Sequence, residues 1–345
     1  MLDLFTPQAE QDKLHHNFVE ITKDPHPYAR ELLQSWTDGF IDRDNKFVKE
    51  FQTTFNSSFW ELYLFNVFKQ YGFKIDFSKA MPDFIITTPF EVCVEAVVSN
   101  NAFNAKPEYE RKPEDNPKLE EIVRTATIRL ANAICYKYKD KLKKTYSNLD
   151  YVKRKPFILA VAPFEQPYFW EQTNRAINHV LYGIKGYKFK NPNNKVFTEI
   201  TECINEPFIE KDNGSEIQLG FFANNQMEEI SAVLFSNVAT FGKVRALTKD
   251  KDPRQMLFMF SKFNANGLHP FEGILPKDKY YESLETGLSL YLNSFAKYPL
   301  PEDFIKSFPS WSYFDFEQEM PLGNSKDGEL LNRTVIVYNK VRNLW

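Results

Sequence analysis

The spacing of apolar residues changes after the first seventy residues of this chain. Before that point apolar residues recur every three or four positions, which predicts helices, and beyond it shorter apolar runs predict strands. A helical stripe returns over residues 117–144, and an unbroken apolar run at 157–162 predicts a buried strand. The central elements are therefore a helix at 59–71, a strand at 73–77, two strands within 81–98, a helix at 117–144, a strand at 157–162 and a helix at 168–182.

Weaker patterns flank this central region. Residues 1–46 are polar and mixed, with a short predicted helix at 28–36. Beyond Gly183 we expect strands at 230–235, 256–261 and 288–292, and a short helix at 240–247. We divide the chain into an N-terminal helical arm at 1–54, an α/β core at 55–185 and a C-terminal extension at 186–345 that packs on the core.

Each of the two strands within 81–98 carries one acid among apolar neighbours. Asp83 follows Pro82 at the start of the first strand, and Glu95 lies between Val94 and Ala96 in the second. A buried carboxylate must be paired, protonated or bound to a cation, because an isolated buried charge is too costly. Two acids on adjacent strands of a hairpin can converge on one point, and Mg²⁺ prefers one or two carboxylates together with phosphate and water. The pattern predicts a divalent-metal site.

Each acid also has a plainer explanation. Asp83 after Pro82 is typical of a turn at a strand start. Glu95 is harder to explain in this way because its neighbours are apolar, although exposure on an edge strand would account for it. Glu61 lies in the preceding helix, where Ser58 and Glu61 have the form of a capping box. We keep two alternatives for Glu61: a helix cap, or a third acid that faces the pair.

Composition excludes several classes of protein. Hydrophobic residues make up 43% of the 345 residues, the formal net charge is −3, and no run reaches the roughly 20 apolar residues of a membrane span. The three cysteines are far apart and lack metal-finger spacing, which favours reduced thiols. The first residues lack the pattern of a signal peptide. We therefore expect a cytoplasmic protein with no membrane partner.

The acids and their order resemble the PD-(D/E)XK nuclease superfamily. Its metal-binding signature is matched by Pro82-Asp83 and, twelve positions on, Glu95-Ala96-Val97, and the FWELYL segment at 59–64 and the VEA segment at 94–96 resemble those of bacterial members. The resemblance covers roughly residues 55–183 and implies a restriction-endonuclease-like core of helix, three strands, helix, strand and helix. It also implies that Asp83, Glu95 and the Ala96 carbonyl bind Mg²⁺ or Mn²⁺, and that the metal activates a water to attack a phosphodiester.

The chain departs from the signature at its lysine. Val97 stands at that position and can neither position a water nor offset transition-state charge. Either the lysine has moved to another element or the site is inactive. Lys137 is our candidate replacement, because it continues the buried stripe of the 117–144 helix one turn beyond Ala133. Arg129 and Lys139 are the alternatives.

Basic residues cluster near the end of the same helix. A run of positive side chains there can track a phosphate backbone, and it can equally complement the helix dipole. The candidates for nucleic-acid contact are Arg129, Lys139, Lys141, Lys153 and Arg154.

The sequence thus predicts a metal-dependent nuclease acting on DNA or RNA, with Glu61, Asp83, Glu95 and Lys137 as catalytic candidates. A role in defence, for example against phage, is compatible with that chemistry. The alternative is a non-catalytic nucleic-acid-binding or regulatory protein that kept the fold. The oligomeric state is open, with a homodimer among the options.

Overall fold

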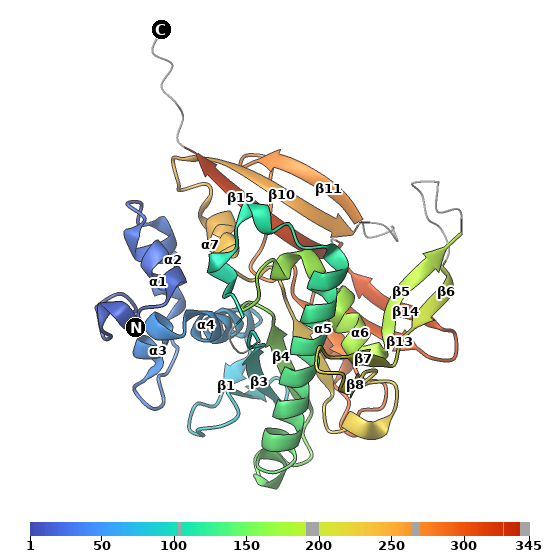
Figure 1. The fold of residues 1–345 in the computed structure, drawn as a ribbon. Coiled ribbons are helices and arrows are strands. Elements are labelled where there is room, and N and C mark those ends of the chain that lie inside the picture. The colour runs from blue at the N-terminus through green and yellow to red at the C-terminus, as the bar shows by residue number, and fades with distance from the viewer. Residues whose placement is uncertain (103–104, 191–199, 264–269, 327, 339–345) are drawn as a thin grey trace.

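The fold is mixed α/β and is built on one large sheet (Figure 1). The computed structural model describes residues 1–345 except 103–104, 191–199, 264–269, 327 and 339–345. No helix within the described residues combines the length and the apolar character that a membrane crossing requires.

Four helices precede the first strand and form an aromatic layer. They are α1 (His16–Lys23), α2 (Tyr28–Trp36), α3 (Phe47–Thr53) and α4 (Phe55–Gln70). Ring contacts run along α3 and α4 at the four-residue spacing seen in the sequence, with Phe51 and Phe55 centroids 5.0 Å apart and Phe55 and Phe59 centroids 5.4 Å apart. The arm therefore shares its core with α4 and the sheet.

The predicted order of central elements is observed. Helix α4 is followed by β1 (Lys74–Ile75), β2 (Phe84–Thr88), β3 (Val92–Val98), α5 (Leu119–Tyr136), β4 (Phe157–Ala162) and α6 (Arg175–Tyr182). Strands β1, β2 and β3 are antiparallel neighbours, and β4 runs parallel to β3. Three boundaries differ from prediction. Helix α5 gives way to a π-helical segment at Lys137–Leu142, and the region before α6 is a separate 3-10 turn at Phe169–Gln172. Strand β1 is shorter than predicted.

Alternate residues of β3 enter two different layers. Cys93 and Val97 belong to the cluster that includes α5 and α6, whereas Val92 and Val94 pack with α4. Figure 1 shows α5 lying across the strands on the side facing the viewer. Because side chains alternate along a strand, Glu95 points to the same face as Cys93 and Val97.

The C-terminal half completes the same sheet. Strand β9 (Ala232–Phe235) lies parallel to β4, as expected for the apolar run at 230–235, and the order continues through β12 (Ser289–Leu292), β13 (Ser310–Asp315) and β14 (Met320–Ser325). The sheet therefore joins residues on both sides of position 185. The remaining helices are α7 (Phe241–Thr248) and α8 (Glu302–Lys306).

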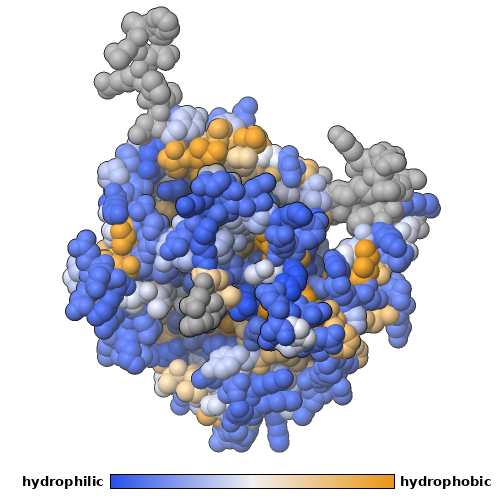
Figure 2. Space-filling view, in the orientation of Figure 1, coloured by the Kyte–Doolittle hydropathy of each residue, from blue (hydrophilic) through white to orange (hydrophobic). Residues whose placement is uncertain are grey.

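Three smaller sheets surround this frame. Two are hairpins, β5 (Ile184–Phe189) with β6 (Ile200–Asn205) and β7 (Phe208–Glu210) with β8 (Glu216–Gln218). The third has the order β11 (Pro270–Pro276), β10 (Gln255–Phe263) and β15 (Leu330–Tyr338). Figure 2 shows hydrophobic colour over this three-stranded sheet, where Met259, Ile274 and Ile336 are 41%, 62% and 44% exposed.

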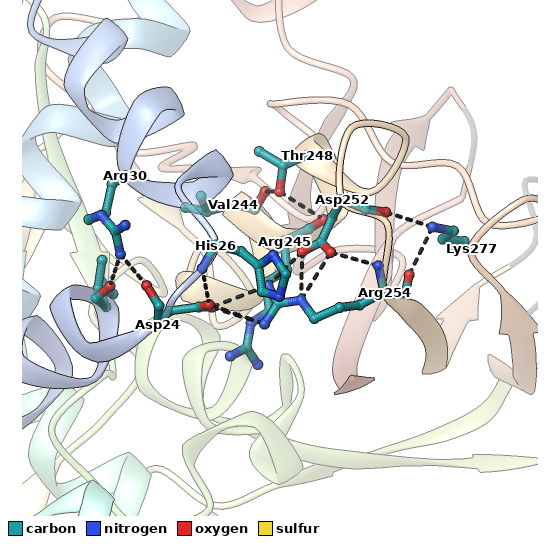
Figure 3. A network of polar contacts seen from close by, with 10 residues as sticks. Asp24, His26, Arg30, Val244, Arg245, Thr248, Asp252, Arg254 and Lys277 are labelled. Carbon is teal, nitrogen blue, oxygen red and sulfur yellow. Dashed lines mark hydrogen bonds and ion pairs between the residues drawn. The ribbon is translucent and has the colours of Figure 1, made fainter. Parts of the chain in front are cut away.

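A charged network ties the N-terminal arm to the C-terminal half (Figure 3). The Arg254 guanidinium donates to Asp24, which follows α1, at 3.2 Å, and to Asp252 at 2.6 Å. Arg30 of α2 donates to the backbone carbonyl of Asp24. The side chains of Arg254 and Asp24 are only 15% and 10% exposed, so salt screens this contact less than it screens a surface ion pair.

We predict that residues 1–185 do not fold as an independent unit. Removing 186–345 removes β9 and uncovers the edge of β4, whose six residues are all buried in the full chain. The expected result is an aggregating fragment in size-exclusion chromatography. A soluble 1–185 fragment with a cooperative thermal transition would contradict this.

We also predict that Asp24→Asn lowers the free energy of unfolding by about 2 kcal/mol, because hydrogen bonds to a charged group are lost in a poorly exposed site. Denaturant titration measures the change. Asp44→Asn is the control: the pair of Asp44 with Lys46 is exposed, and its loss should change stability by less than about 0.5 kcal/mol. Equal effects of the two substitutions would show that the network does not tie the arm down.

Candidate active site

The strand register brings Asp83 and Glu95 together. Phe84 of β2 pairs with Val94 of β3, so the antiparallel register places Asp83, one residue before β2, opposite Glu95. Residues opposite each other on adjacent strands share a face of the sheet. The Ala96 backbone N–H donates to Asp83 Oδ2 at 2.7 Å, which fixes the aspartate against β3.

Glu95 is buried and has two donors on one oxygen. The residue is 4% exposed, so the edge-strand explanation is wrong: β3 lies between β2 and β4. Lys137 Nζ donates to Glu95 Oε1 at 2.6 Å, and the Tyr146 hydroxyl donates to the same oxygen at 3.0 Å. Glu95 Oε2 forms no hydrogen bond with the described residues.

Lys137 reaches this site from the end of α5. Its backbone N–H still bonds to the Ala133 and Ile134 carbonyls, so it keeps the helical register of the buried stripe. The π-helical segment begins at Lys137, and such segments are frequent at functional sites. The Lys137 side chain is 22% exposed, so its ammonium lies between the buried glutamate and solvent. Val97 remains buried on the same face and carries no polar group.

Asp83 lies near a second cation. Arg43 Nη2 is 3.9 Å from Asp83 Oδ1, and the same guanidinium donates to the backbone carbonyls of Lys79 and Pro82 at 2.8 and 3.2 Å. Arg43 therefore holds the segment before β2 and contributes positive charge. The Asp83 side chain is 28% exposed, so part of it remains open to solvent.

Glu61 does not cap a helix. Helix α4 begins at Phe55 with Thr54 as its N-cap, so Ser58 lies inside the first turns and the predicted capping box is wrong. The four-residue spacing of Phe51, Phe55 and Phe59 runs across the boundary between α3 and α4, so the sequence pattern did not reveal that α4 begins at Phe55. Glu61 forms no hydrogen bond with the described residues, and its charge interacts with Asp83, Arg43 and Glu95. Glu61 therefore interacts electrostatically with the acid pair.

The pKa values of two of these acids are raised. Desolvation raises the pKa of Asp83 to about 7, the charge of Glu95 adds to the shift, and the Ala96 N–H, Lys137 and Arg43 oppose it. Desolvation raises the pKa of Glu61 to about 8, with a further contribution from Asp83. Burial likewise raises the pKa of the Tyr146 hydroxyl, and Glu95 reinforces that shift, so this group stays a donor. Such shifts cluster at functional sites.

The donor set fits a hard divalent cation. Asp83 and Glu95 each have one oxygen fixed by a protein donor and one without a hydrogen bond, and Mg²⁺ is commonly held by one or two carboxylates with water and substrate phosphate. The described residues contain no cluster of three or more His, Cys, Asp or Glu side chains able to hold a metal. A cation here would depend on the acid pair, the Ala96 carbonyl and non-protein ligands.

The other basic candidates lie near the same end of α5, apart from Arg129 within the helix. Lys139 and Arg154 are exposed, and within the described chain neither forms an ion pair. Lys153 pairs with Asp150 at 3.0 Å, and Lys141 is half-buried. Arg129 has a buried Nε without a hydrogen-bond partner, and no contact with Glu95 is made by Arg129 or Lys139. Of the three candidates for the displaced lysine, only Lys137 reaches the acid.

Sequence reasoning missed Arg43 and Tyr146. Arg43 lies in a polar segment between two helices, and Tyr146 lies in a 3-10 turn after the π-helical segment. Neither position follows a period that fixes its direction. The sequence shows only that each residue lies close in the chain to a helix or strand that neighbours the acids.

No family model matches the chain, and neither the curated proteins nor the solved structures contain a significant match to it.

We predict that Glu61→Gln changes how stability depends on pH. The pKa of Glu61 is raised from 4.5 to about 8, so the unfolded chain releases this proton at lower pH than the folded chain. The wild type should therefore lose stability relative to the variant as pH rises from about 4.5 to about 8, and the difference should then level off. Thermal unfolding in EDTA at a series of pH values measures the difference.

Glu20→Gln is the matched control, since Glu20 is exposed and pairs only with Lys23. Its melting temperature should follow the wild type at every pH. Parallel curves for Glu61→Gln and the wild type would contradict a buried acid coupled to Asp83.

Proposed function

We propose that this protein is a metal-dependent nuclease with a restriction-endonuclease-like core that hydrolyses phosphodiester bonds of DNA or RNA. The observation that carries the proposal is the contact of Lys137 Nζ with Glu95 Oε1 at 2.6 Å, opposite Asp83. This contact places a cation beside two acids in a chain that has Val97 where the signature has its lysine. The order and pairing of α4, β1–β3, α5 and β4 agree with the fold that the resemblance implies.

The residues divide the work of binding and orientation. Asp83, Glu95 and the Ala96 carbonyl would hold Mg²⁺ or Mn²⁺. The bound cation supplies positive charge against the phosphate and lowers the pKa of water. The Ala96 N–H orients Asp83, and the Tyr146 hydroxyl orients Glu95.

Lys137 has the role of the displaced motif lysine. Its side chain is 22% exposed, so a phosphate could approach it while the ammonium remains close to Glu95. Positive charge placed where negative charge develops lowers the barrier, because a preorganised donor stabilises the transition state more than the ground state. Lys139 and Arg154 are exposed basic residues in the segments that follow Lys137 in the chain, and such side chains suit a phosphate backbone.

A non-catalytic nucleic-acid-binding or regulatory protein is the alternative. The observation that favours it is the double donation of Lys137 and Tyr146 to Glu95 Oε1, which satisfies the buried carboxylate without a metal. In that case the pair would stabilise the fold, and the basic region would bind nucleic acid without cleavage.

We predict that Lys137→Ala lowers the rate of phosphodiester cleavage by about 10²- to 10³-fold, the range for loss of one preorganised donor. The assay uses plasmid DNA, single-stranded DNA and RNA with Mg²⁺, Mn²⁺ or EDTA. Asp83→Asn should abolish both cleavage and metal binding, whereas Lys137→Ala should retain metal binding. Lys306→Ala, in an exposed pair with Glu302, is the control and should cleave at the wild-type rate.

Absence of cleavage in all three substrates with either metal would contradict the enzyme. Binding of nucleic acid without cleavage would favour the alternative. Cleavage by Lys137→Ala at the wild-type rate would show that Lys137 serves the fold and not the chemistry.

A further inference from the structure

Two hollows open on the protein surface away from the acid pair. The larger, about 700 Å³, lies between α5, α6 and the β7–β8 hairpin. Its lining includes four acids, and two of its cations are paired with them, Arg124 with Asp212 and Lys185 with Glu206. The second hollow, about 410 Å³, has a lining without Asp or Glu: His16, Asn17, Tyr109, Arg111, Lys112 and Tyr168. We call it the aromatic hollow.

Flat rings surround the aromatic hollow in contact with one another. The His16 and Tyr109 rings are stacked, with centroids 4.7 Å apart and planes 15° apart. Behind Arg111 lies Trp170, whose ring centroid is 4.8 Å from the guanidinium carbon, and Tyr168 lies 5.8 Å from the same indole. Tyr109 is 37% exposed and also meets the His15 ring edge-on, with centroids 5.8 Å apart.

The walls are held by hydrogen bonds that leave the cations without a carboxylate partner. Arg111 donates to the backbone carbonyl of Glu108 at 2.7 Å, and the Tyr168 hydroxyl donates to that of Lys112 at 2.5 Å. Neither Arg111 nor Lys112 forms an ion pair within the described residues. Asn17 donates to Glu108 Oε1 at 2.7 Å.

Two of the acids near the hollow, Glu108 and Glu165, are partly or fully buried, whereas Glu110, Glu114 and Asp115 of the segment that joins β3 to α5 are exposed. Glu108 is 4% exposed with one carboxylate oxygen lacking a partner, and Glu165 accepts a hydrogen bond from Asn56 at 3.1 Å. Desolvation raises the pKa of both, and hydrogen bonds from asparagine side chains oppose that shift. Asp115 pairs with Lys106 at 2.9 Å and accepts a hydrogen bond from the Lys112 backbone N–H at 2.8 Å, so the positive charge of the lining itself comes from the Arg111 and Lys112 side chains.

The hollow lies beyond the strand ends that lead from the acid site. Tyr109, Arg111 and Lys112 belong to the segment that joins β3 to α5, and Tyr168 follows β4. Glu95 is three residues before the end of β3, a rise of roughly 10 Å along the strand. The catalytic strand therefore leads directly into the segment that forms one wall of the hollow.

We propose that the aromatic hollow binds a nucleoside phosphate, with the base stacked on Tyr109 and the phosphate held by Arg111 and Lys112. Base stacking on an aromatic side chain, combined with a cationic groove, is the recurrent means of holding single-stranded nucleic acid. The nucleotide is either one unit of a strand or a free mononucleotide. The strand form rests on the proposed nuclease function, because it makes the hollow a substrate subsite outside the acid pair.

The test measures binding by the full-length Asp83→Asn protein in EDTA, so that its result does not depend on cleavage. The probes are AMP, a labelled single-stranded DNA and a labelled single-stranded RNA of equal length. Calorimetry measures the binding of AMP, and fluorescence anisotropy measures the binding of the labelled strands. Tyr109→Ala should weaken binding of the responsive probe about 10-fold, within the 1–3 kcal/mol range of one base stack. Lys112→Ala should lower the slope of log Kd against log salt concentration by about 0.7 for a single strand.

Tyr281→Ala, which removes an 83% exposed tyrosine elsewhere, and Lys306→Ala are the matched controls and should bind as the parent does. Binding of AMP that Tyr109→Ala weakens assigns a free-nucleotide site, whereas a response confined to the strands assigns a substrate subsite. No binding of any probe, or equal binding by the parent, Tyr109→Ala and Lys112→Ala, would overturn the proposal.

Discussion

A carboxylate buried in a central strand is the constraint on which this site depends. Glu95 lies in β3 between apolar neighbours and is 4% exposed, so its charge requires a compensating cation. Lys137 provides one, and the Tyr146 hydroxyl adds a neutral donor to the same oxygen. Asp83 adds a second acid to the site, the charge of Glu61 interacts with it, and Arg43 is a second cation 3.9 Å from Asp83. Desolvation is the main cause of the raised pKa values of Asp83 and Glu61, and the charges of neighbouring acids add to it, so a divalent cation bound here would favour the ionised carboxylates.

The surrounding fold explains how such a site is kept. Helix α5 crosses one face of the sheet and α4 the other, so both can direct side chains toward the β2–β3 hairpin. Strand β9 and its neighbours cover β4, which makes the C-terminal half part of the frame that holds β3 in place. The contact of Arg254 with Asp24 then fastens the N-terminal arm to that half. The acid site is thus held by contacts that involve the N-terminal arm, the central strands and the C-terminal half.

The parts of the site that follow a period were predictable from sequence. The alternation of β2 and β3 predicts that Asp83 and Glu95 share a face, and the stripe of α5 predicts the direction of Lys137. That second prediction succeeds because the π-helical segment begins at Lys137 and not before it. The capping box failed because Ser58 and Glu61 match a local motif within a helix that starts earlier, at Phe55. Arg43 and Tyr146 reach the site through irregular segments, where tertiary contacts and not local spacing set the direction of a side chain.

The most direct test of this account is the anomalous diffraction of Mn²⁺ in crystals grown or soaked with the ion. The account predicts one Mn²⁺ bound by Asp83 and Glu95, and its loss in Glu95→Gln crystals treated in the same way. Crystals in which Mn²⁺ binds elsewhere, while Lys137 and Tyr146 still satisfy Glu95 and no ion lies at the acid pair, would contradict it.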